Sequence, residues 1–446
     1  MAVTRSFGDP DLTPDNFNDF SKQEIYADSG ITGLTQVEPF PPARSTDPMD
    51  LATVIGAAKA KAIQDSGKIT FHAVGDTGGI QEPQYQFAVA DAMTTDLSSG
   101  AAFFYHLGDV VYYFGQEQYY FEQFYDPYRN YNAPIFAIPG NHDGVVYSGE
   151  TAKSLAAFVA NFCSATPTHS PDAQGAVRTT MDQPGVYFTL NAPFVKFIGL
   201  YSNTSEGSTE GIISGSGVGN AQINFLKQQL AAAKTERENG LGRALVIITH
   251  HPPFTASPKH IPSPTMLQQI DDACEAAGIQ PDLYLSGHAH QYERYTRTVS
   301  GKEIPFLVAG TGGYYSLPGL QKNPPAIPST PQSGTDQSNN PLTLEVYNDS
   351  TFGFLRITVS ADTLTGVFVT VDPTTGEAGV GDTFTVDLNE GSLSNKPVKS
   401  GTGKKKGSTK KSTGKTGTKK SSVTAAKKTS SKPAKKTAKA AGGRRK

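Results

Sequence analysis

Cysteine is scarce in this chain, and long apolar runs are missing altogether. The 446 residues include only Cys163 and Cys274, too few for a disulfide framework. We expect both to be free thiols, as is usual in a reducing compartment. No apolar stretch approaches the ~20 residues of a membrane-spanning helix. Residues 1–30 show no apolar stretch behind a basic start, so no secretory signal is visible. These absences favour a cytoplasmic protein over a secreted one.

Acidic residues are absent from the last segment of the chain. Residues 396–446 carry 19 Lys or Arg, which leaves 20 basic against 41 acidic residues in the rest. The net charge of −2 therefore conceals a body of about −21 and a polycationic tail. Because the tail has almost no apolar side chains to bury, it cannot offset the entropy cost of folding, and we predict that it is disordered.

Three roles stay open for this tail. It is a solvated extension, or it binds nucleic acid or another polyanion nonspecifically through clusters such as 404–406 and 444–446. In the third reading it folds back on the acidic body, a contact that salt would reverse. No aromatic residue follows Phe384, which excludes base stacking by the tail.

The rest of the chain alternates strand and helix patterns, and it is long enough to bury a sizeable core. We predict an N-terminal extension ending in a helix (1–67), one large domain (68–390) and the tail (391–446). Helices are expected over 49–65, 84–96, 116–128, 221–237 and 266–277. Strands are expected over 69–74, 102–107, 135–138, 186–190, 194–200, 244–249, 283–285, 306–309, 352–359, 364–371 and 383–386, with loops at 203–220 and 316–341. This order indicates a layered α/β protein with mixed sheets.

Five short blocks carry most of the functional signal. Each follows a hydrophobic or β-branched run, and α/β folds build active sites from polar residues at the carboxyl tips of strands. The blocks are Gly75-Asp76-Thr77-Gly78, Gly108-Asp109-Val110-Val111-Tyr112, Gly140-Asn141-His142-Asp143, Ile247-Ile248-Thr249-His250 and Gly287-His288-Ala289-His290. Each block alone is a weak signal, but five in this order are hard to explain as ordinary turns.

The side chains in these blocks suit a two-metal site that cleaves phosphate esters. Such esters repel incoming hydroxide, and two cations about 3.5–4 Å apart neutralise their charge and lower the pKa of a bound water. The site needs one carboxylate that bridges both ions and further ligands for each. His142 follows the predicted ligand Asn141, and we expect it to protonate the leaving group, since imidazoles exchange protons near neutral pH.

At these blocks the sequence resembles the purple acid phosphatases, within the calcineurin-like metallophosphoesterase superfamily. The resemblance covers residues 69–386 and all five blocks, with Ile247 where the family usually has Val. It extends to Gln291-Tyr292-Glu293-Arg294 and to Phe352-Gly353-Phe354-Leu355-Arg356. It implies an αββα sandwich of two mixed β-sheets flanked by helices, with the metals at the strand ends.

The resemblance also implies which residues hold the metals. An Fe(III) ion would bind Asp76, Asp109, Tyr112 and His290. Asp109 would bridge to a Zn, Mn or Fe(II) ion, which would also bind Asn141, His250 and His288.

Tyr112 separates this chain from most metallophosphoesterases. They carry Asp-x-His in the first block, whereas here the third position is Gly78 and a tyrosine ends the second block. A phenolate oxygen is a hard, charged donor that suits a ferric ion better than zinc. The alternative for Tyr112 is an ordinary core aromatic in a tyrosine-rich stretch. No Arg follows Asp109, which argues against the protein phosphatase branch.

The remaining histidines are harder to assign. His251 should point away from His250, and support of a ligand and contact with substrate are both open. His260 lies where the family often places a histidine on the substrate phosphate, and a plain surface histidine is the alternative. His72 and His106 are expected to be satisfied core residues, and nothing around His169 gives it a role.

The sequence therefore predicts a binuclear metallophosphatase that hydrolyses phosphate monoesters by attack of a metal-bound hydroxide. One alternative is a phosphodiesterase acting on nucleotides or nucleic acid, which the basic tail favours. A nucleic-acid-binding protein that acts through its tail is the alternative from another class. The oligomeric state is not indicated by any of these patterns.

Overall fold

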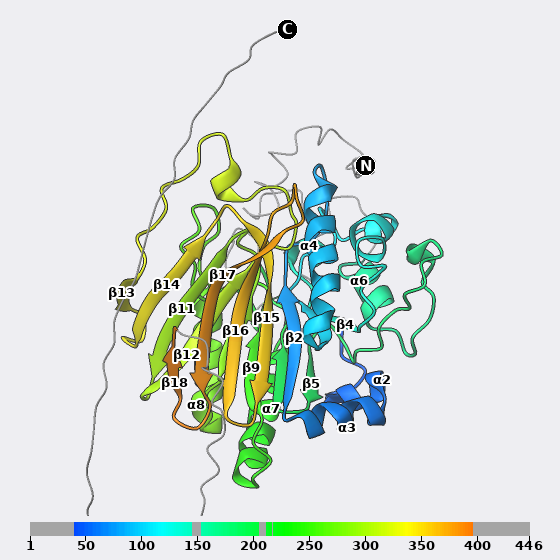
Figure 1. Cartoon of the computed structure of the whole chain (residues 1–446). Helices are drawn as coiled ribbons and strands as arrows, with labels where there is room; N and C mark the ends of the chain where they lie inside the picture. The colour runs from blue at the N-terminus through cyan, green and yellow to red at the C-terminus, as the bar shows by residue number, and fades with distance from the viewer. Residues whose placement is uncertain (1–39, 145–152, 205–210, 216, 396–446) are drawn as a thin grey trace, which may run out of the picture. The chain divides into compact units, whose positions relative to one another are not determined.

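The computed structural model describes residues 40–144, 153–204, 211–215 and 217–395 (Figure 1). Within them two mixed β-sheets lie face to face with helices on their outer sides, so the predicted fold class is confirmed. The tail at 396–446 and residues 1–39 of the predicted N-terminal extension lie outside the described residues. Disorder and polyanion binding of the tail therefore stay predictions.

The first sheet has seven strands in the order β18-β17-β16-β15-β2-β3-β4. Its parallel half contains β2 (Lys68–Val74), β3 (Ala101–His106) and β4 (Ile135–Ala137). Its antiparallel half contains β15 (Phe352–Ser360), β16 (Thr363–Val371), β17 (Ala378–Asp387) and β18 (Ser392–Ser394). The helix α4 (Pro83–Asp96) connects β2 to β3 and packs on β15.

The second sheet has nine strands in the order β1-β5-β6-β9-β10-β12-β11-β14-β13. Parallel pairing joins β6 (Val195–Gly199), β9 (Ala244–Ile248), β10 (Leu283–Ser286) and β12 (Lys302–Ala309). The flanking strands are β1 (Met49–Asp50), β5 (Phe188–Ala192), β11 (Tyr292–Val299), β13 (Gln332–Thr335) and β14 (Pro341–Asn348). A separate pair joins β7 (Asn203–Thr204) to β8 (Gly211–Ile212).

The inner core lies between the two sheets. Phe71 on β2 makes an edge-on contact with Phe197 on β6, with ring centroids 4.9 Å apart. Val74, three residues further along β2, belongs instead to the outer core under the helices. Because strand side chains alternate between faces and both faces are covered, the central strands read as unbroken apolar runs. Each fully buried Phe or Ile contributes about 1.5–3 kcal/mol.

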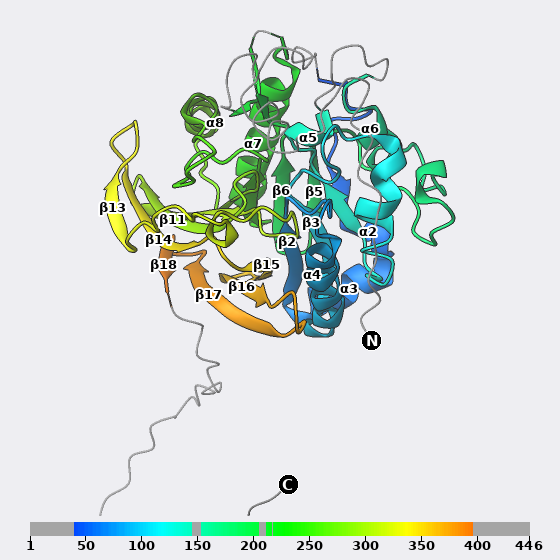
Figure 2. The same cartoon turned by 90° about the horizontal axis from the view of Figure 1, so that it is seen from above.

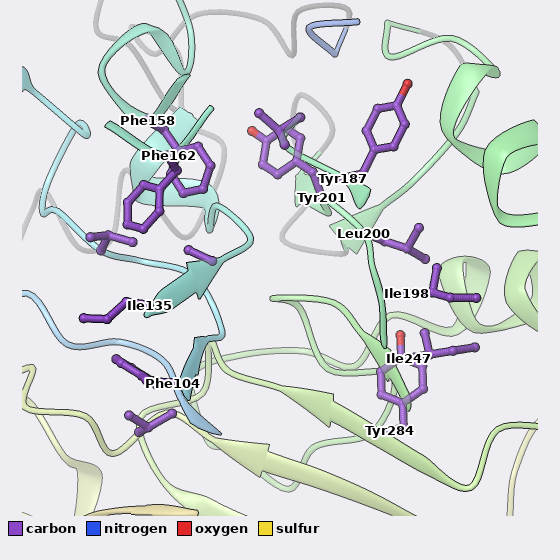
Figure 3. Close-up of a cluster of buried hydrophobic side chains, with 14 of the residues drawn as sticks. Phe104, Ile135, Phe158, Phe162, Tyr187, Ile198, Leu200, Tyr201, Ile247 and Tyr284 are labelled. Atoms are coloured by element: carbon purple, nitrogen blue, oxygen red, sulfur yellow. The ribbon is translucent and has the colours of Figure 1, made fainter. Parts of the chain in front are cut away.

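Helices cover part of the outer face of each sheet (Figure 2). On the nine-stranded sheet, α7 (Ala221–Glu238) and α8 (Pro264–Ala277) pack together, and α7 lies against β6. On the other sheet, Phe158 and Phe162 of α6 (Ala156–Phe162) lie above Phe104 and Ile135, as Figure 3 shows. No helix in the described part of the chain is long and apolar enough to cross a membrane.

The helix predicted over 49–65 is divided in the structure. Met49 and Asp50 form β1, and the Asp50 carboxylate then caps α2 (Leu51–Ile55) by accepting from the Ala52 N–H at 2.8 Å. Gly56, with φ of 87°, separates α2 from α3 (Ala57–Ser66). Glycine adopts this backbone conformation without the strain that other residues would meet, so it ends the first helix.

Three other predicted elements are wrong. The predicted loop 203–220 contains β7 and β8, which pair with each other. The segment 116–128 is not an α-helix but a 3₁₀-helix (Glu117–Tyr119) followed by a π-helical turn (Phe121–Tyr125). The predicted loop 316–341 contains β13, whose residues are all exposed and polar, so no hydrophobic alternation marks it. Sequence analysis also missed β11, because two of its buried residues are arginines that form ion pairs with Asp271, Asp336 and Asp382.

Cys163 and Cys274 are free thiols, as expected, and the structure buries both.

Candidate metal centre

The five blocks meet at one edge of the sandwich. The first three follow the carboxyl ends of β2, β3 and β4, which are parallel neighbours. The last two follow β9 and β10, which are parallel neighbours in the other sheet. Because parallel strands bring their carboxyl ends to the same edge, segments more than 200 residues apart in sequence lie side by side.

One group of potential ligand atoms surrounds the hydroxyl of Tyr112. This oxygen lies 3.2 Å from Asp109 Oδ2, 3.4 Å from Asp76 Oδ1 and 3.4 Å from His290 Nε2. His290 Nε2 is also 3.6 Å from Asp76 Oδ1. The four residues predicted for the iron are thus brought together.

A second group surrounds the side-chain oxygen of Asn141. Asn141 Oδ1 lies 3.1 Å from His250 Nε2 and 3.0 Å from His288 Nδ1. His250 Nε2 is 3.2 Å from Asp109 Oδ2, the same oxygen that belongs to the first group. Asp109, His250 and His288 have potential ligand atoms that all lie within 4.8 Å of one another.

These separations fit metal coordination. Ligand atoms about 2.0–2.2 Å from an ion lie about 2.8–3.6 Å from one another in octahedral or tetrahedral geometry. Both carboxylates are buried, and neither Asp76 nor Asp109 has a Lys or Arg ion partner among the described residues. Nδ2 of Asn141 and Nε2 of His288 are buried without a hydrogen-bond partner in the described part. Since buried carboxylates are costly unless paired, this donor set fits cations.

Glycines in the blocks allow this close approach. A Cβ on Gly140 would lie 2.0 Å from Asp109 Oδ1, and a Cβ on Gly287 would lie 2.6 Å from Asp76 Oδ2. At Gly78 the Cβ would lie 2.5 Å from the Tyr112 ring. No side chain fits at these positions while the carboxylates and the phenol keep their places.

Three of the predicted ligands have a left-handed backbone. The φ angles are 57° at Asp76, 54° at Asp109 and 68° at His288. This conformation is uncommon for residues other than glycine, and backbone strain of this kind clusters at functional sites. The three residues lie just after β2, β3 and β10, where this conformation turns the backbone out of the strand direction.

Electrostatic coupling links the carboxylates to the histidines. Burial opposes charge on Asp109, yet His250 and His142 hold its pKa well below the usual range. Burial raises the pKa of Asp76. The two carboxylates outweigh burial at His250 and raise the pKa of that imidazole to about 9. Burial lowers the pKa of His288 and His290, which favours the neutral form that binds metals.

His142 lies beside this centre with a defined orientation. Its Nδ1 is 2.9 Å from the Tyr113 carbonyl oxygen, and its ring centroid is 4.4 Å from that of Tyr112. Because a carbonyl only accepts, Nδ1 carries a proton, and Nε2 is the nitrogen that can exchange one. The His142 backbone N–H donates to Asp109 Oδ1 at 3.0 Å, which ties the segment to the shared carboxylate.

Sequence reasoning missed two polar residues that hold the site. The Asp143 carboxylate accepts from the backbone N–H groups of Val110, Val111 and Gly140, and so joins the second and third blocks. Burial, with the nearby charge of Asp109, raises the pKa of Asp143 to about 7. Gln123 accepts from the Tyr112 N–H at 2.8 Å and donates to the Tyr112 carbonyl at 2.9 Å. Asp143 had a signal, since it directly follows His142, whereas Gln123 had none.

The other histidines divide as follows. The His260 ring centroid is 4.4 Å from that of His288 and 5.2 Å from that of His290, so His260 is buried at the centre and is not a surface residue. His251 contacts the His288 ring at 4.2 Å and hydrogen-bonds Ser202. His72 and His106 are satisfied in the core, by Tyr131 with Asp96 and by Thr77 respectively, as expected.

Comparison with known proteins decides the family. The profile of the calcineurin-like phosphoesterases matches residues 69–292, half of the chain and all five blocks. The chain belongs to this family. It is therefore a hydrolase of the metallophosphoesterase type, and its family implies a metal centre.

Two curated relatives refine the likeness. Tartrate-resistant acid phosphatase type 5 of Rattus norvegicus is 25% identical over 261 residues, 55% of this chain and 73% of the relative. The Mus musculus protein of the same name is 24% identical over the same shares. This metallophosphoesterase is thus purple acid phosphatase-like, as predicted. Among solved structures, GAP50, described as the anchor in the inner membrane complex of Plasmodium, matches with a TM-score of 0.46 and 15% identity, covering 71% of this chain and 87% of that one.

Proposed function

We propose that the chain hydrolyses phosphate monoesters at a two-metal centre. One observation carries the proposal: a single oxygen, Asp109 Oδ2, belongs to both groups of ligand atoms. Asp76, Tyr112 and His290 complete one ion's set. Asn141, His250 and His288 complete the other. When bound, the two cations supply charge neutralisation and an acidified water.

The metals we propose are Fe(III) on the Tyr112 side and Zn, Mn or Fe(II) on the Asn141 side. A phenolate between two carboxylates is a hard, anionic donor set, which suits a trivalent ion. Two imidazoles with an amide oxygen suit a borderline divalent ion.

Three histidines are proposed to act on the substrate. His142 donates a proton from Nε2 to the leaving-group oxygen, because its Nδ1 is committed to the Tyr113 carbonyl. His260 and His251, whose rings lie within 4.4 Å of the His288 ring, hold phosphate oxygens on the Asn141 side. Burial lowers the pKa of His260 to about 3, so that histidine is a neutral donor in the free protein.

The likeness to acid phosphatases favours monoesters over diesters. Phosphodiester cleavage is the second candidate, since the basic residues of 396–446 would retain a nucleic acid substrate nonspecifically. A protein that acts through its tail alone is disfavoured, because the described residues bring the full predicted ligand set together.

The first experiment compares an aryl phosphate monoester with the matching diester on iron- and zinc-loaded protein. We expect faster monoester cleavage and a loss of about 10²-fold in kcat in His142→Ala. His169→Ala is the control, because His169 is exposed. Faster diester cleavage would redirect the function to nucleotides and nucleic acid, and absence of both activities in metal-replete protein would refute the proposal.

The Tyr112 assignment has an optical test. Iron-loaded protein should show a tyrosinate-to-iron(III) absorption band, and Tyr112→Phe should lose it, because Phe keeps the ring stacked on Tyr314 at 4.2 Å but has no oxygen. Tyr113→Phe is the matched control and should keep the band. An unchanged band in Tyr112→Phe with full iron content would show that Tyr112 is not a ligand.

A further inference from the structure

The loop 252–263 carries His260 to the candidate metal centre. It leaves the His250 block and returns at the start of α8, and the Ser263 N–H closes its base by donating to the Pro252 carbonyl at 3.0 Å. Its own secondary structure is irregular, so the position of His260 depends on contacts that hold the loop.

A chain of hydrogen bonds runs through this loop to His260. The Glu293 carboxylate accepts from Thr255 Oγ1 at 2.9 Å and from the Ala256 N–H at 3.1 Å. Thr255 Oγ1 in turn accepts from the Ser257 N–H at 3.0 Å. Ser257 Oγ then accepts from the His260 N–H at 3.2 Å.

Glu293 is suited to anchor this chain. It is fully buried on β11, three residues after His290. The start of this strand therefore lies next to a predicted metal ligand and, through Glu293, also binds the loop 252–263. Gln291 Nε2 also donates to its carboxylate. Among the described residues no Lys or Arg forms an ion pair with Glu293, which therefore depends on these neutral donors.

We propose that Glu293 is a positioning residue that sets the affinity for the substrate phosphate by holding the loop, and through it His260. The proposal rests on the proposed function of His260 as a phosphate contact. A carboxylate buried only to stabilise the fold would leave substrate affinity unchanged when its link to the loop is cut, and this difference can be measured.

Two isosteric variants disrupt this series of hydrogen bonds at different positions. Glu293→Gln replaces the carboxylate that accepts from the loop with a neutral amide, which is a weaker acceptor. Thr255→Val removes the hydroxyl that joins Glu293 to Ser257. We expect each to raise KM for an aryl phosphate monoester about tenfold and to weaken inhibition by inorganic phosphate by the same factor, with kcat within about twofold. If the two variants act through His260, introducing Thr255→Val into His260→Ala should raise the KM of His260→Ala by less than a further factor of two.

Glu303→Gln is the matched control, because Glu303 lies on the adjacent strand β12 and accepts from the Leu393 N–H, away from the loop. Metal content and the visible band should stay at the level of the unaltered protein in every variant. An unchanged KM in Thr255→Val, or loss of metal as the sole defect, would overturn the positioning role. If the unaltered protein cleaves no monoester, the proposed function fails. The role of Glu293 is then tested separately by calorimetry, which compares the affinity of the unaltered protein and of the variants for inorganic phosphate.

Discussion

Asp109→Asn is expected to lower turnover of an aryl phosphate by at least about 10³-fold, equivalent to about 4 kcal/mol of transition-state stabilisation. The reason is geometric. Oδ2 of Asp109 is the atom shared by the Tyr112 group and the His250 group, at 3.2 Å from each. Asparagine keeps the shape and an oxygen at Oδ1 for the His142 N–H, but it replaces the shared anion with a neutral amide.

Metal analysis separates this outcome from misfolding. Asp109→Asn should bind less than one ion per chain while keeping the unfolding temperature of metal-free protein. Asp372→Asn is the control, since Asp372 lies in an exposed turn where it accepts from Thr374 and Thr375. Two bound ions and unchanged turnover in Asp109→Asn would mean that another residue bridges the metals.

Gly140→Ala is expected to have an effect of similar size without removing any polar group. The added Cβ would lie 2.0 Å from Asp109 Oδ1 and 2.4 Å from the Asp109 nitrogen. Neither atom can move aside, because one belongs to the backbone and the other to the shared carboxylate. Asp109 is therefore displaced from both groups, with a loss of at least about 10³-fold in turnover and about 1–3 kcal/mol in the free energy of unfolding.

Gly242→Ala provides the comparison for this steric prediction. A Cβ at Gly242 meets no atom within 4 Å, so we expect unchanged turnover and a change of at most about 0.5 kcal/mol in the free energy of unfolding. Thermal unfolding and steady-state kinetics on both variants give the answer. Normal turnover in Gly140→Ala would show that the third block can move away from Asp109 without loss.

Local patterns predicted a layered α/β protein with mixed sheets and the polar blocks at the strand ends, whereas the αββα sandwich and the division of the ligands into two groups came from the family resemblance. Buried strands such as β2, β3 and β9 appear as apolar runs, and the ligand-bearing blocks directly follow them. The π-helical turn at Phe121–Tyr125 could not be predicted, because its Gln123 is held by the backbone of Tyr112, which lies outside the segment and 11 residues earlier. The contacts of Glu293 with the loop could not be predicted either, because its partners Thr255 and Ala256 lie 38 and 37 residues earlier in the chain.

The contact between Gly78 and Tyr112 constrains how such a centre can arise. A Cβ at position 78 would lie 2.5 Å from the Tyr112 ring, so the two positions cannot both carry side chains in this arrangement. In this backbone an imidazole donor from position 78 and the phenol of Tyr112 exclude one another, so the centre can hold one of these two donors but not both. The choice of donor for this ion is therefore limited by packing as well as by coordination chemistry.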